Sequence, residues 1–599
     1  MAQKMSTDRV DESQRLAIEV GAETRQVVIA APGSGKTEVV SALLEYLIKE
    51  NAVDPVNGLL VISFSNAAVH AAEARLRARG ASPVAVQTMD SLATELLSDV
   101  SETEYTHLGF DARIALATLL LKRDRWDRID NLEHLVVDEV QDLVGVRAEL
   151  LSAIIAALPD DAGFTLLGDP AQGIYDFQTR PTPSGEFPGS RLTSNDLLLV
   201  VSAGNGVVTR TLTGQYRAIS RDAQAAVRLR ESALPGGDAS AIEDFEASLV
   251  DLGPIEDVLD LVGSWPGTTA LLTATNGQAL RAAGTLRSRG VLTEIKRSTR
   301  EQIAAGWIAR LLGDSPTEAI TRADIEKLIA ERPPELDVPR IWRALRSLSG
   351  ARGTEVSLTR VSSRLRSPRP LIPDLVEQTT ARIVVSTVHR AKGLEFDNVI
   401  LLDFPDRKWR DAQPQIDEII RTRFVALTRA RSRLARASGP DDRIVRPDIK
   451  RGSRRARWYV GGPKKWMTLG YEIGVGDIEA IFEDPSPGQS RLGQEVRAGD
   501  QVTFQLETDR STLAIPVYVV THDGAQIART SRAFGEDLAA RIGTLENRRR
   551  SWPGIGSAQV ENVGTVASEP RPESEWRHGL YLTPVVTGFL ELNWNGASE

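Results

Sequence analysis

The sequence predicts an α/β fold, because short apolar runs alternate with polar turns and helical patterns. Residues 27–37, 59–66, 134–142 and 164–177 each contain a short apolar run that is followed by glycine or polar residues. Runs of this length bounded by turn residues are typical of buried strands. Ligands of α/β sheets bind at the carboxyl ends of the strands, so the turn residues are the candidate site residues.

The stretch at 27–37 reads VVIAAPGSGKT and precedes an amphipathic helix pattern over 38–49. It has the spacing of a phosphate-binding loop, with Ala30 where the strict form has its first glycine. Glycines let backbone N–H groups approach phosphates, and a helix N-terminus favours negative charge. Lys36 is expected to reach the β- and γ-phosphates, and the Thr37 hydroxyl to hold Mg²⁺. The remaining expected nucleotide contacts are Ala31, Pro32, Gly33, Ser34 and Gly35.

Two further strand ends carry chemically informative side chains. In HLVVDEVQD (134–142), Asp138 is expected to hold Mg²⁺ through water and Glu139 to polarise an attacking water. In FTLLGDPAQGIYDF (164–177), Gln172 is placed to sense a γ-phosphate, and Tyr175 and Phe177 offer aromatic faces. These patterns predict a nucleoside triphosphatase.

The overall composition narrows the class of protein. A chain of 599 residues leaves room for roughly three to five domains. The net charge of −9 argues against a wholly basic nucleic-acid-binding protein but allows a local basic track. The absence of cysteine excludes disulfides, thiolate catalysis, iron–sulfur clusters and cysteine zinc sites. We find neither a signal peptide nor an apolar run of about 18 residues, and therefore expect a cytoplasmic protein without a membrane span.

The phosphate loop, VVDEVQD and GDPAQGIYDF occur in the order found in superfamily 1 DNA helicases of the UvrD/Rep type, which the sequence resembles. Later stretches resemble further motifs of that family: LTGQYR at 212–217, LLTATNGQA at 271–279, VSTVHRAKGLEFDNVI at 385–400 and RFVALTRARSRL at 423–434. The resemblance implies an α/β protein with two RecA-like P-loop NTPase domains, ATP in the cleft between them, mostly helical insertions and a C-terminal β-rich domain.

The resemblance also implies roles for particular residues. Gln14 would contact adenine, Tyr216 would stack on it, and Glu395 would contact the ribose. Arg217 and Arg429 would reach the γ-phosphate from the second domain, and such arginines can accelerate hydrolysis by about 10³–10⁵. The implied chemistry is in-line attack of water on the γ-phosphate.

A track for single-stranded DNA is implied across both motor domains. Stacking of bases on aromatic side chains tolerates any base sequence, which suits a motor that walks on DNA. Two departures from the family pattern, Glu38 in place of arginine and Ala67 in place of lysine, remove positive charge. The implied DNA contacts are Phe64, Asn66, Thr88, Tyr175 and Phe177 in the first domain, and Thr387 and His389 in the second.

We expect six segments along the chain. They are a first RecA-like domain (1–75 and 130–205), a small helical insertion (76–129), a second RecA-like domain (206–290 and 378–442), a reduced helical accessory insertion (291–377), a basic linker (443–469) and a β-rich domain (470–599). The basic and aromatic residues of the linker suit nucleic acid and a solvated linker equally well.

The leading hypothesis is an ATP-dependent helicase or translocase that moves 3′ to 5′ on single-stranded DNA and acts at junctions with duplex. A second hypothesis is a DNA-dependent ATPase subunit of a larger repair or defence complex, with the C-terminal domain contacting a protein partner. A third is an RNA motor on the same fold. The sequence does not indicate whether the protein acts in repair, replication restart or anti-phage defence.

Overall fold

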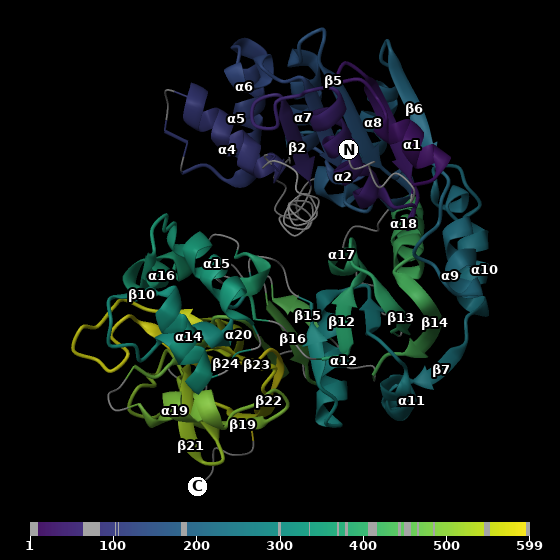
Figure 1. Cartoon of the computed structure of the whole chain (residues 1–599). Helices are drawn as coiled ribbons and strands as arrows, with labels where there is room; N and C mark the ends of the chain where they lie inside the picture. The colour runs from purple at the N-terminus through teal and green to yellow at the C-terminus, as the bar shows by residue number, and fades with distance from the viewer. Residues whose placement is uncertain are drawn as a thin grey trace. The chain divides into compact units, whose positions relative to one another are not determined.

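A computed structural model describes most of the chain in two units. Unit 1 comprises residues 1–250, 392–398 and 408–434, and unit 2 comprises 251–391, 399–407 and 435–599. Figure 1 shows the elements in chain order. The described residues are 10–63, 84, 86–101, 104–105, 107–180, 189–296, 301–332, 334, 336–367, 371–377, 381–404, 416–440, 445–448, 457–463, 467–482, 486–543 and 551–594.

Unit 1 is built on a six-stranded parallel sheet with the strand order β3-β2-β4-β5-β1-β6. Strands β2, β4 and β5 are buried along their whole length, as their continuous apolar runs predict. The strands are β1 Arg25–Ala30, β2 Leu59–Ser63, β3 Val86–Gln87, β4 His134–Asp138, β5 Gly163–Gly168 and β6 Val207–Leu212.

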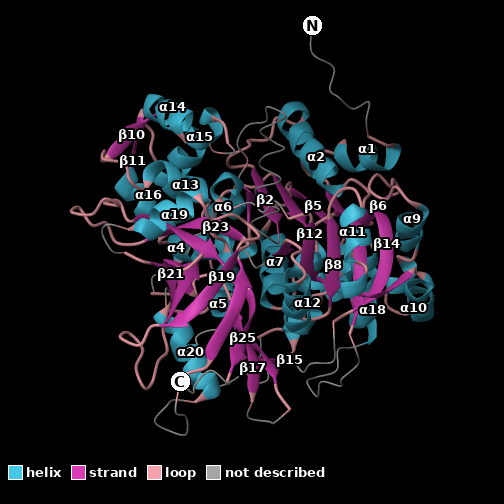
Figure 2. Ribbon diagram, turned by 90° about the horizontal axis from the view of Figure 1, so that it is seen from below, coloured by secondary structure: helices cyan, strands magenta, loops and turns pink. Residues whose placement is uncertain are grey.

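Helices cover both faces of this sheet because successive strand residues point to opposite sides. Leu60 and Ile62 pack in one core with α4, α5, α7 and α8, whereas Leu59 and Val61 pack in a second core with α1 and α2. Figure 2 shows α2 and α7 on opposite sides of the strands. The helices of unit 1 are α1 Glu12–Ile18, α2 Lys36–Glu50, α4 Met89–Val100, α5 Phe110–Arg123, α6 Asp127–Asp130, α7 Val146–Ala157, α8 Ser194–Ser202, α9 Arg221–Arg228, α10 Ala239–Ser248 and α18 Ile416–Leu427.

The first sheet extends further along the chain than we expected. Strand β6 pairs in parallel with β1, from Arg25 opposite Val207 to Ala30 opposite Leu212. The boundary expected after residue 205 therefore falls just before a strand of the first sheet. The reason is that β6 is a half-exposed edge strand, so its sequence VVTRTL lacks the buried apolar run that marks the other strands.

A second six-stranded sheet has the strand order β7-β14-β13-β8-β12-β9, and most of its residues belong to unit 2. Strand β12 pairs in parallel with both β8 and β9, and β14 pairs in parallel with β7. These elements are β7 Asp251–Pro254, α11 Leu259–Ser264, β8 Thr269–Thr273, α12 Asn276–Ser288, β9 Thr293–Ile295, β12 Ile383–Thr387, α17 Val388–Ala391, β13 Phe396–Asp403 and β14 Ala430–Ser438.

The C-terminal region is β-rich, as expected. Nine strands form a sheet with the order β15-β16-β17-β25-β22-β19-β20-β21-β18, and β23 pairs with β24 in an antiparallel ribbon. Its elements are β15 Val445–Asp448, β16 Arg457–Gly461, β17 Thr468–Ile473, β18 Ile478–Ala480, α19 Pro487–Gln494, β19 Gln501–Leu506, β20 Tyr518–His522, β21 Ala525–Thr530, α20 Arg532–Ile542, β22 Gly554–Gln559, β23 Asn562–Ala567, β24 Leu580–Val585 and β25 Gly588–Asn593.

The accessory helices and the β-rich region share one hydrophobic core, although we expected separate modules. Ile308 of α13 and Ile341 of α15 belong to the same buried cluster as Val563 and Leu582 of the strand ribbon. Thr565 Oγ1 donates to Ala305 O and accepts from Ala309 N. Figure 1 shows α14, α15 and α16 beside the C-terminal strands. The accessory elements are α13 Gly306–Leu312, β10 Ala319–Thr321, α14 Arg322–Glu331, α15 Val338–Ser349, β11 Glu355–Ser357 and α16 Leu358–Leu365.

The described part of the expected basic linker is folded. Residues 445–448 and 457–461 form β15 and β16, which continue the nine-stranded sheet. Arg457 is buried and pairs with Asp477 and Asp537, a group that we call the Arg457 cluster. Arg457 is thus a core residue, because two buried carboxylates compensate its charge.

Turns and caps fix the ends of several elements. A hairpin turn at 522–524 joins β20 to β21, with positive φ at Asp523 and Gly524. Helix α4 is capped by Thr88, and α13 begins at Gly306. Within the described ranges, no helix combines the length and apolar character that crossing a bilayer requires.

Candidate nucleotide site and DNA track

The phosphate-binding loop lies between β1 and α2 of unit 1. Gly33 and Gly35 have φ values of 80° and 81°, a left-handed conformation that favours glycine. A Cβ atom on Gly33 would lie 2.2 Å from Gln215 Oε1, so this position also has no room for a side chain. Helix α2 begins at Lys36, which places its first-turn N–H groups at the end of the loop.

Lys36 lies against the two acids at the end of β4. Its Nζ forms an ion pair with Glu139 and lies 3.6 Å from Asp138 Oδ1. Burial by itself would lower the pKa of Lys36, but the charges of Glu139 and Asp138 outweigh burial, so the pKa of Lys36 is raised overall. Burial alone would raise the pKa of Glu139, but Lys36 and Lys392 lower it to about 2. Glu139 is therefore an ionised carboxylate at neutral pH.

Gln172, from the turn after β5, contacts Arg429. Arg429 Nη2 donates to Gln172 Oε1 at 3.2 Å, and Gln172 Nε2 donates to Asp169 Oδ2 at 3.0 Å. Arg429 is 2% exposed, and burial together with the charge of Arg217 lowers its pKa to about 9. A buried cation beside an amide side chain can stabilise negative charge that develops during a reaction.

Arg217 extends from the segment that closes over the phosphate loop. Its Nη2 pairs with Glu395 Oε1 at 2.7 Å. The Gln215 amide holds this segment, donating to Pro32 O and accepting from Arg217 N. Arg217 Nε and Nη1 are buried and have no hydrogen-bond partner among the described residues. Buried donors without partners are costly, so these two N–H groups suit an anionic ligand.

Gln14 and Tyr216 flank the same loop. Gln14 is buried, donates from Nε2 to Ser34 O at 2.9 Å, and accepts from Asp11 N. Tyr216 is half exposed, and its hydroxyl donates to Asp11 Oδ2 at 2.7 Å, which raises the pKa of Tyr216 to about 12. Asp11 also caps α1, so a single carboxylate fixes the helix and the tyrosine.

Sequence reasoning missed several residues that complete this network. Gln141 links Glu139 to the backbone N–H of Asp169. Asp142 pairs with Lys392, and burial raises the pKa of Asp142 to about 7 despite that cation. Arg230 pairs with the fully buried Asp169 at 2.9 Å. Gln141, Asp142 and Lys392 lie inside the quoted motifs, and their polar character in buried segments was the available signal.

The residues present fit a magnesium nucleotide. Ser34 Oγ is buried without a partner among the described residues, next to the glycines of the loop. No cluster of three or more histidine, aspartate or glutamate side chains in the described ranges could hold a metal by itself. Asp138 and the Thr37 hydroxyl match the usual Mg²⁺ site, which takes one or two protein oxygens and completes its shell with phosphate and water.

The candidate DNA contacts are distributed over both units. Tyr175 and Phe177 follow β5, with ring centres 6.2 Å apart, and Phe177 is 43% exposed. Thr88 is buried, and its hydroxyl accepts a hydrogen bond from Ser91 N. Thr88 therefore has a structural role as the N-cap of α4. Phe64 and Asn66 lie outside the described residues.

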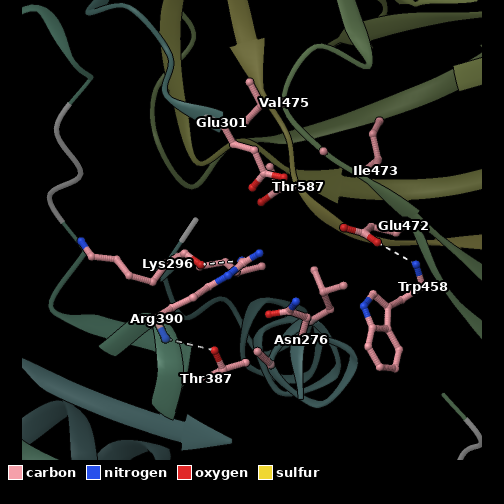
Figure 3. Close-up of a pocket in the computed structure, with 14 residues that line it drawn as sticks. Asn276, Lys296, Glu301, Thr387, Arg390, Trp458, Glu472, Ile473, Val475 and Thr587 are labelled. Carbon is pink, nitrogen blue, oxygen red and sulfur yellow. Dashed lines mark hydrogen bonds between the residues drawn. The ribbon is translucent and has the colours of Figure 1, made fainter. Parts of the chain in front are cut away.

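In unit 2, Thr387 ends β12 and His389 lies on α17. Thr387 lines a pocket with Arg390, Lys296 and Asn276, all from the second sheet and its helices. Figure 3 shows this wall facing a second wall of the β-rich region, which includes Glu472 and Thr587. Residues from two expected domains therefore meet beside Thr387. The complete lining is Asn276, Ala279, Leu280, Ile295, Lys296, Glu301, Thr387, Arg390, Trp458, Glu472, Ile473, Gly474, Val475 and Thr587.

The two walls of this pocket are fixed to each other by Arg287 of α12. Arg287 is buried, donates to Thr293 Oγ1 at 3.0 Å, and forms an ion pair with Glu561 of the β-rich region. Its Nη1 also donates to Thr587 O. Burial lowers the pKa of Arg287 to about 10.

Comparison with protein families agrees with this geometry. Residues 14–178 match the family model of an AAA domain, and residues 372–437 match that of the UvrD-like helicase C-terminal domain. No curated protein matches the chain. Together the two matches support a UvrD-like superfamily 1 helicase, an ATP-dependent enzyme that acts on DNA. The resemblance and the α/β fold class drawn from the sequence are confirmed.

Proposed function

We propose that this chain is an ATP-driven motor that moves 3′ to 5′ along single-stranded DNA and unwinds duplex at junctions. The observation that carries the proposal is the convergence of Lys36, Glu139, Gln172, Arg217 and Arg429 on one glycine loop in unit 1. Three cations, a carboxylate and an amide around a helix N-terminus suit transfer of a phosphoryl group to water.

The proposed nucleotide contacts follow from these positions. The backbone of residues 31–35 would cradle the phosphates, and Lys36 would exchange its pairing with Glu139 for phosphate oxygens. Asp138 and Thr37 would hold Mg²⁺, which supplies neutralisation of phosphate charge. Tyr216 would stack on the base with Gln14 beside it.

Hydrolysis would depend on charged groups that are already in place. Glu139 is ionised and would orient a water molecule, while Arg217 and Arg429 would stabilise the negative charge that develops on the transferring phosphoryl group. Glu395 would hold the ribose and orient Arg217. Because the groups are fixed before reaction, their reorganisation adds little to the barrier.

The proposed DNA track uses Tyr175 and Phe177 in unit 1 and Thr387 and His389 in unit 2. Aromatic side chains stack on any base, and Lys296 and Arg390 add positive charge to the pocket beside Thr387. The opposite pocket wall belongs to the β-rich region, so we infer that this region flanks the strand.

The first test is ATP hydrolysis by the full chain with and without single-stranded DNA, with Glu139→Gln as the inactive control. We expect strong stimulation by single strands and loss of turnover in the variant. Added salt should weaken the activation, because each phosphate contact on a single strand contributes a slope of about −0.7 in log K against log salt. Stimulation by RNA alone would instead support the RNA motor.

The direction of movement requires a separate test. Two duplexes with identical sequence, one carrying a 3′ single-stranded tail and the other a 5′ tail, are mixed with the protein and ATP. We expect strand separation of the 3′-tailed duplex. Unwinding of the 5′-tailed duplex alone would contradict the proposed direction and leave the hydrolysis mechanism intact.

A further inference from the structure

Lys392 is a buried lysine with three different neighbours in unit 1. Its side chain is 5% exposed, and its Nζ forms an ion pair with Asp142. The same atom donates to the backbone carbonyl of Gln172 and lies 5.3 Å from the centre of the Tyr175 ring. One ammonium group therefore contacts the acidic turn after β4, the loop after β5 and an aromatic ring of that loop.

The loop at 172–177 has two chemically different ends. At one end the Gln172 amide accepts a hydrogen bond from Arg429. At the other end lie the aromatic rings of Tyr175 and Phe177. Arg421 holds the middle of the loop, because it donates to Gly173 O at 2.6 Å and to Asp176 Oδ2 at 2.8 Å.

We propose that Lys392 is a positioning residue that couples a base stacked on Tyr175 to the placement of Gln172 beside Arg429. This inference rests on the proposed function. The ammonium is attracted to the face of the ring and bonded to the Gln172 carbonyl, so a base that fixes the ring also fixes the backbone that carries the Gln172 amide. A displacement of about 1 Å in such a group is enough to change a rate by about 10²-fold.

Because Lys392 pairs with Asp142, variants of the two residues can separate the coupling role of Lys392 from its contribution to the stability of the fold. A buried ion pair adds little net stability compared with a neutral pair, but removing one partner leaves an uncompensated charge. Asp142 is 3% exposed, so Lys392→Met alone leaves its carboxyl group buried without this partner, which costs stability whether the group stays ionised or takes up a proton. The double variant Lys392→Met with Asp142→Asn removes both charges and regains the lost stability. It does not restore the ammonium that contacts Tyr175 and Gln172.

The test measures the ratio of DNA-stimulated to basal ATP hydrolysis, the KM for ATP and the thermal unfolding midpoint of the full chain. We expect Lys392→Met to lower the ratio about tenfold with a KM within about twofold of wild type. In the double variant the unfolding midpoint recovers and the ratio stays low. The matched control is Arg423→Met on α18, which breaks an exposed ion pair with Glu243 of α10 and keeps the ratio.

Two outcomes would overturn the coupling role. A wild-type ratio in Lys392→Met excludes it directly. Recovery of the ratio together with the unfolding midpoint in the double variant shows that the ion pair has only a structural role. Failure of the proposed function is distinguishable, because the wild-type protein itself would then show no response to single-stranded DNA.

Discussion

The nucleotide site of unit 1 and the Arg457 cluster of unit 2 both bury an arginine, but they satisfy it differently. In the Arg457 cluster, Nε donates to Asp537, and Nη1 and Nη2 donate to Asp477. In the nucleotide site, Arg217 keeps two buried nitrogens without a partner among the described residues. The first arrangement is complete without a ligand, and the second is not.

The pKa of Arg457 and the pKa of Arg429, the second buried arginine of the nucleotide site, shift in opposite directions. Burial lowers the pKa of Arg457, but its two carboxylates outweigh burial and raise it overall. Burial and the charge of Arg217 lower the pKa of Arg429 to about 9. A lowered pKa means that the folded protein disfavours the charged form. Buried charge therefore marks a functional site where neighbouring groups compensate it incompletely.

The largest expected effect comes from Arg429→Met. We expect turnover with saturating single-stranded DNA to fall about 10³-fold or more, equivalent to about 4 kcal/mol, because a positioned arginine stabilises the transferring phosphoryl group. The thermal unfolding midpoint should stay the same or rise, because a disfavoured buried charge is removed. Steady-state hydrolysis and a thermal scan measure the two effects. A lower unfolding midpoint with unchanged turnover would show that Arg429 has a structural role, like Arg457, and no role in hydrolysis.

Arg457→Met should have the opposite profile. Removing the arginine leaves Asp477 and Asp537 buried without a cation, which typically costs about 3–5 kcal/mol of unfolding free energy. Urea unfolding measures this loss, and hydrolysis per folded molecule should not change. As a control, the triple variant with Asp477→Asn and Asp537→Asn should regain part of the stability. Equal stability of the single variant and wild type would show that the cluster is not compensating charge.

His134 on β4 gives the sheet of unit 1 a pH-dependent stability. Burial lowers the pKa of His134 to about 4, against a hydrogen bond to Ala22 O that raises it. His134 therefore binds a proton more readily in the unfolded chain than in the folded one. The contribution of the neutral, buried His134 to the free energy of unfolding is complete above about pH 6.5 and is lost as the pH falls toward 4. The full loss is about 3 kcal/mol.

Thermal unfolding of wild type and His134→Gln at pH 7.5 and 5.0 measures this effect. We expect the wild-type midpoint to fall more between the two pH values than that of the variant. Identical pH dependence of the two proteins would exclude His134 as the titrating group.

The smallest expected effect is that of Tyr216→Phe. The hydroxyl bond to Asp11 holds a half-exposed ring, and one such bond contributes about 0.5–1.5 kcal/mol. We expect the KM for ATP to rise about two- to threefold with an unchanged kcat. Initial rates over a range of ATP concentrations measure both constants, and a change in kcat alone would show that the tyrosine acts on chemistry rather than on nucleotide position.

Much of the nucleotide site was predictable because its residues occupy strand ends and a glycine loop with fixed spacing. Lys36, Asp138 and Glu139 lie close together because β1 and β4 belong to one parallel sheet. Lys392 was not singled out, because its significance depends on Asp142 and Gln172, which are 250 and 220 positions away in the chain. No local pattern reports such a contact.

The boundaries of the expected modules were harder to predict from the sequence than the residues of the nucleotide site. The accessory insertion and the β-rich region read as separate segments, because each has its own helical or alternating pattern. Their apolar faces nevertheless form one core, in which α13 packs on β23 and β24. Removal of the β-rich region would expose this core, so the two are expected to fold together.

The α/β class, the phosphate loop, the acidic strand end and the order of the motifs can be recognised in the sequence, because each depends on residues that are neighbours along the chain. Only the folded chain reveals that Arg429 contacts Gln172, that Arg457 is a core residue, and that the accessory helices share a core with the β-rich region. The physical reason is that charge compensation and apolar packing act between surfaces, and the chain brings those surfaces together from distant positions.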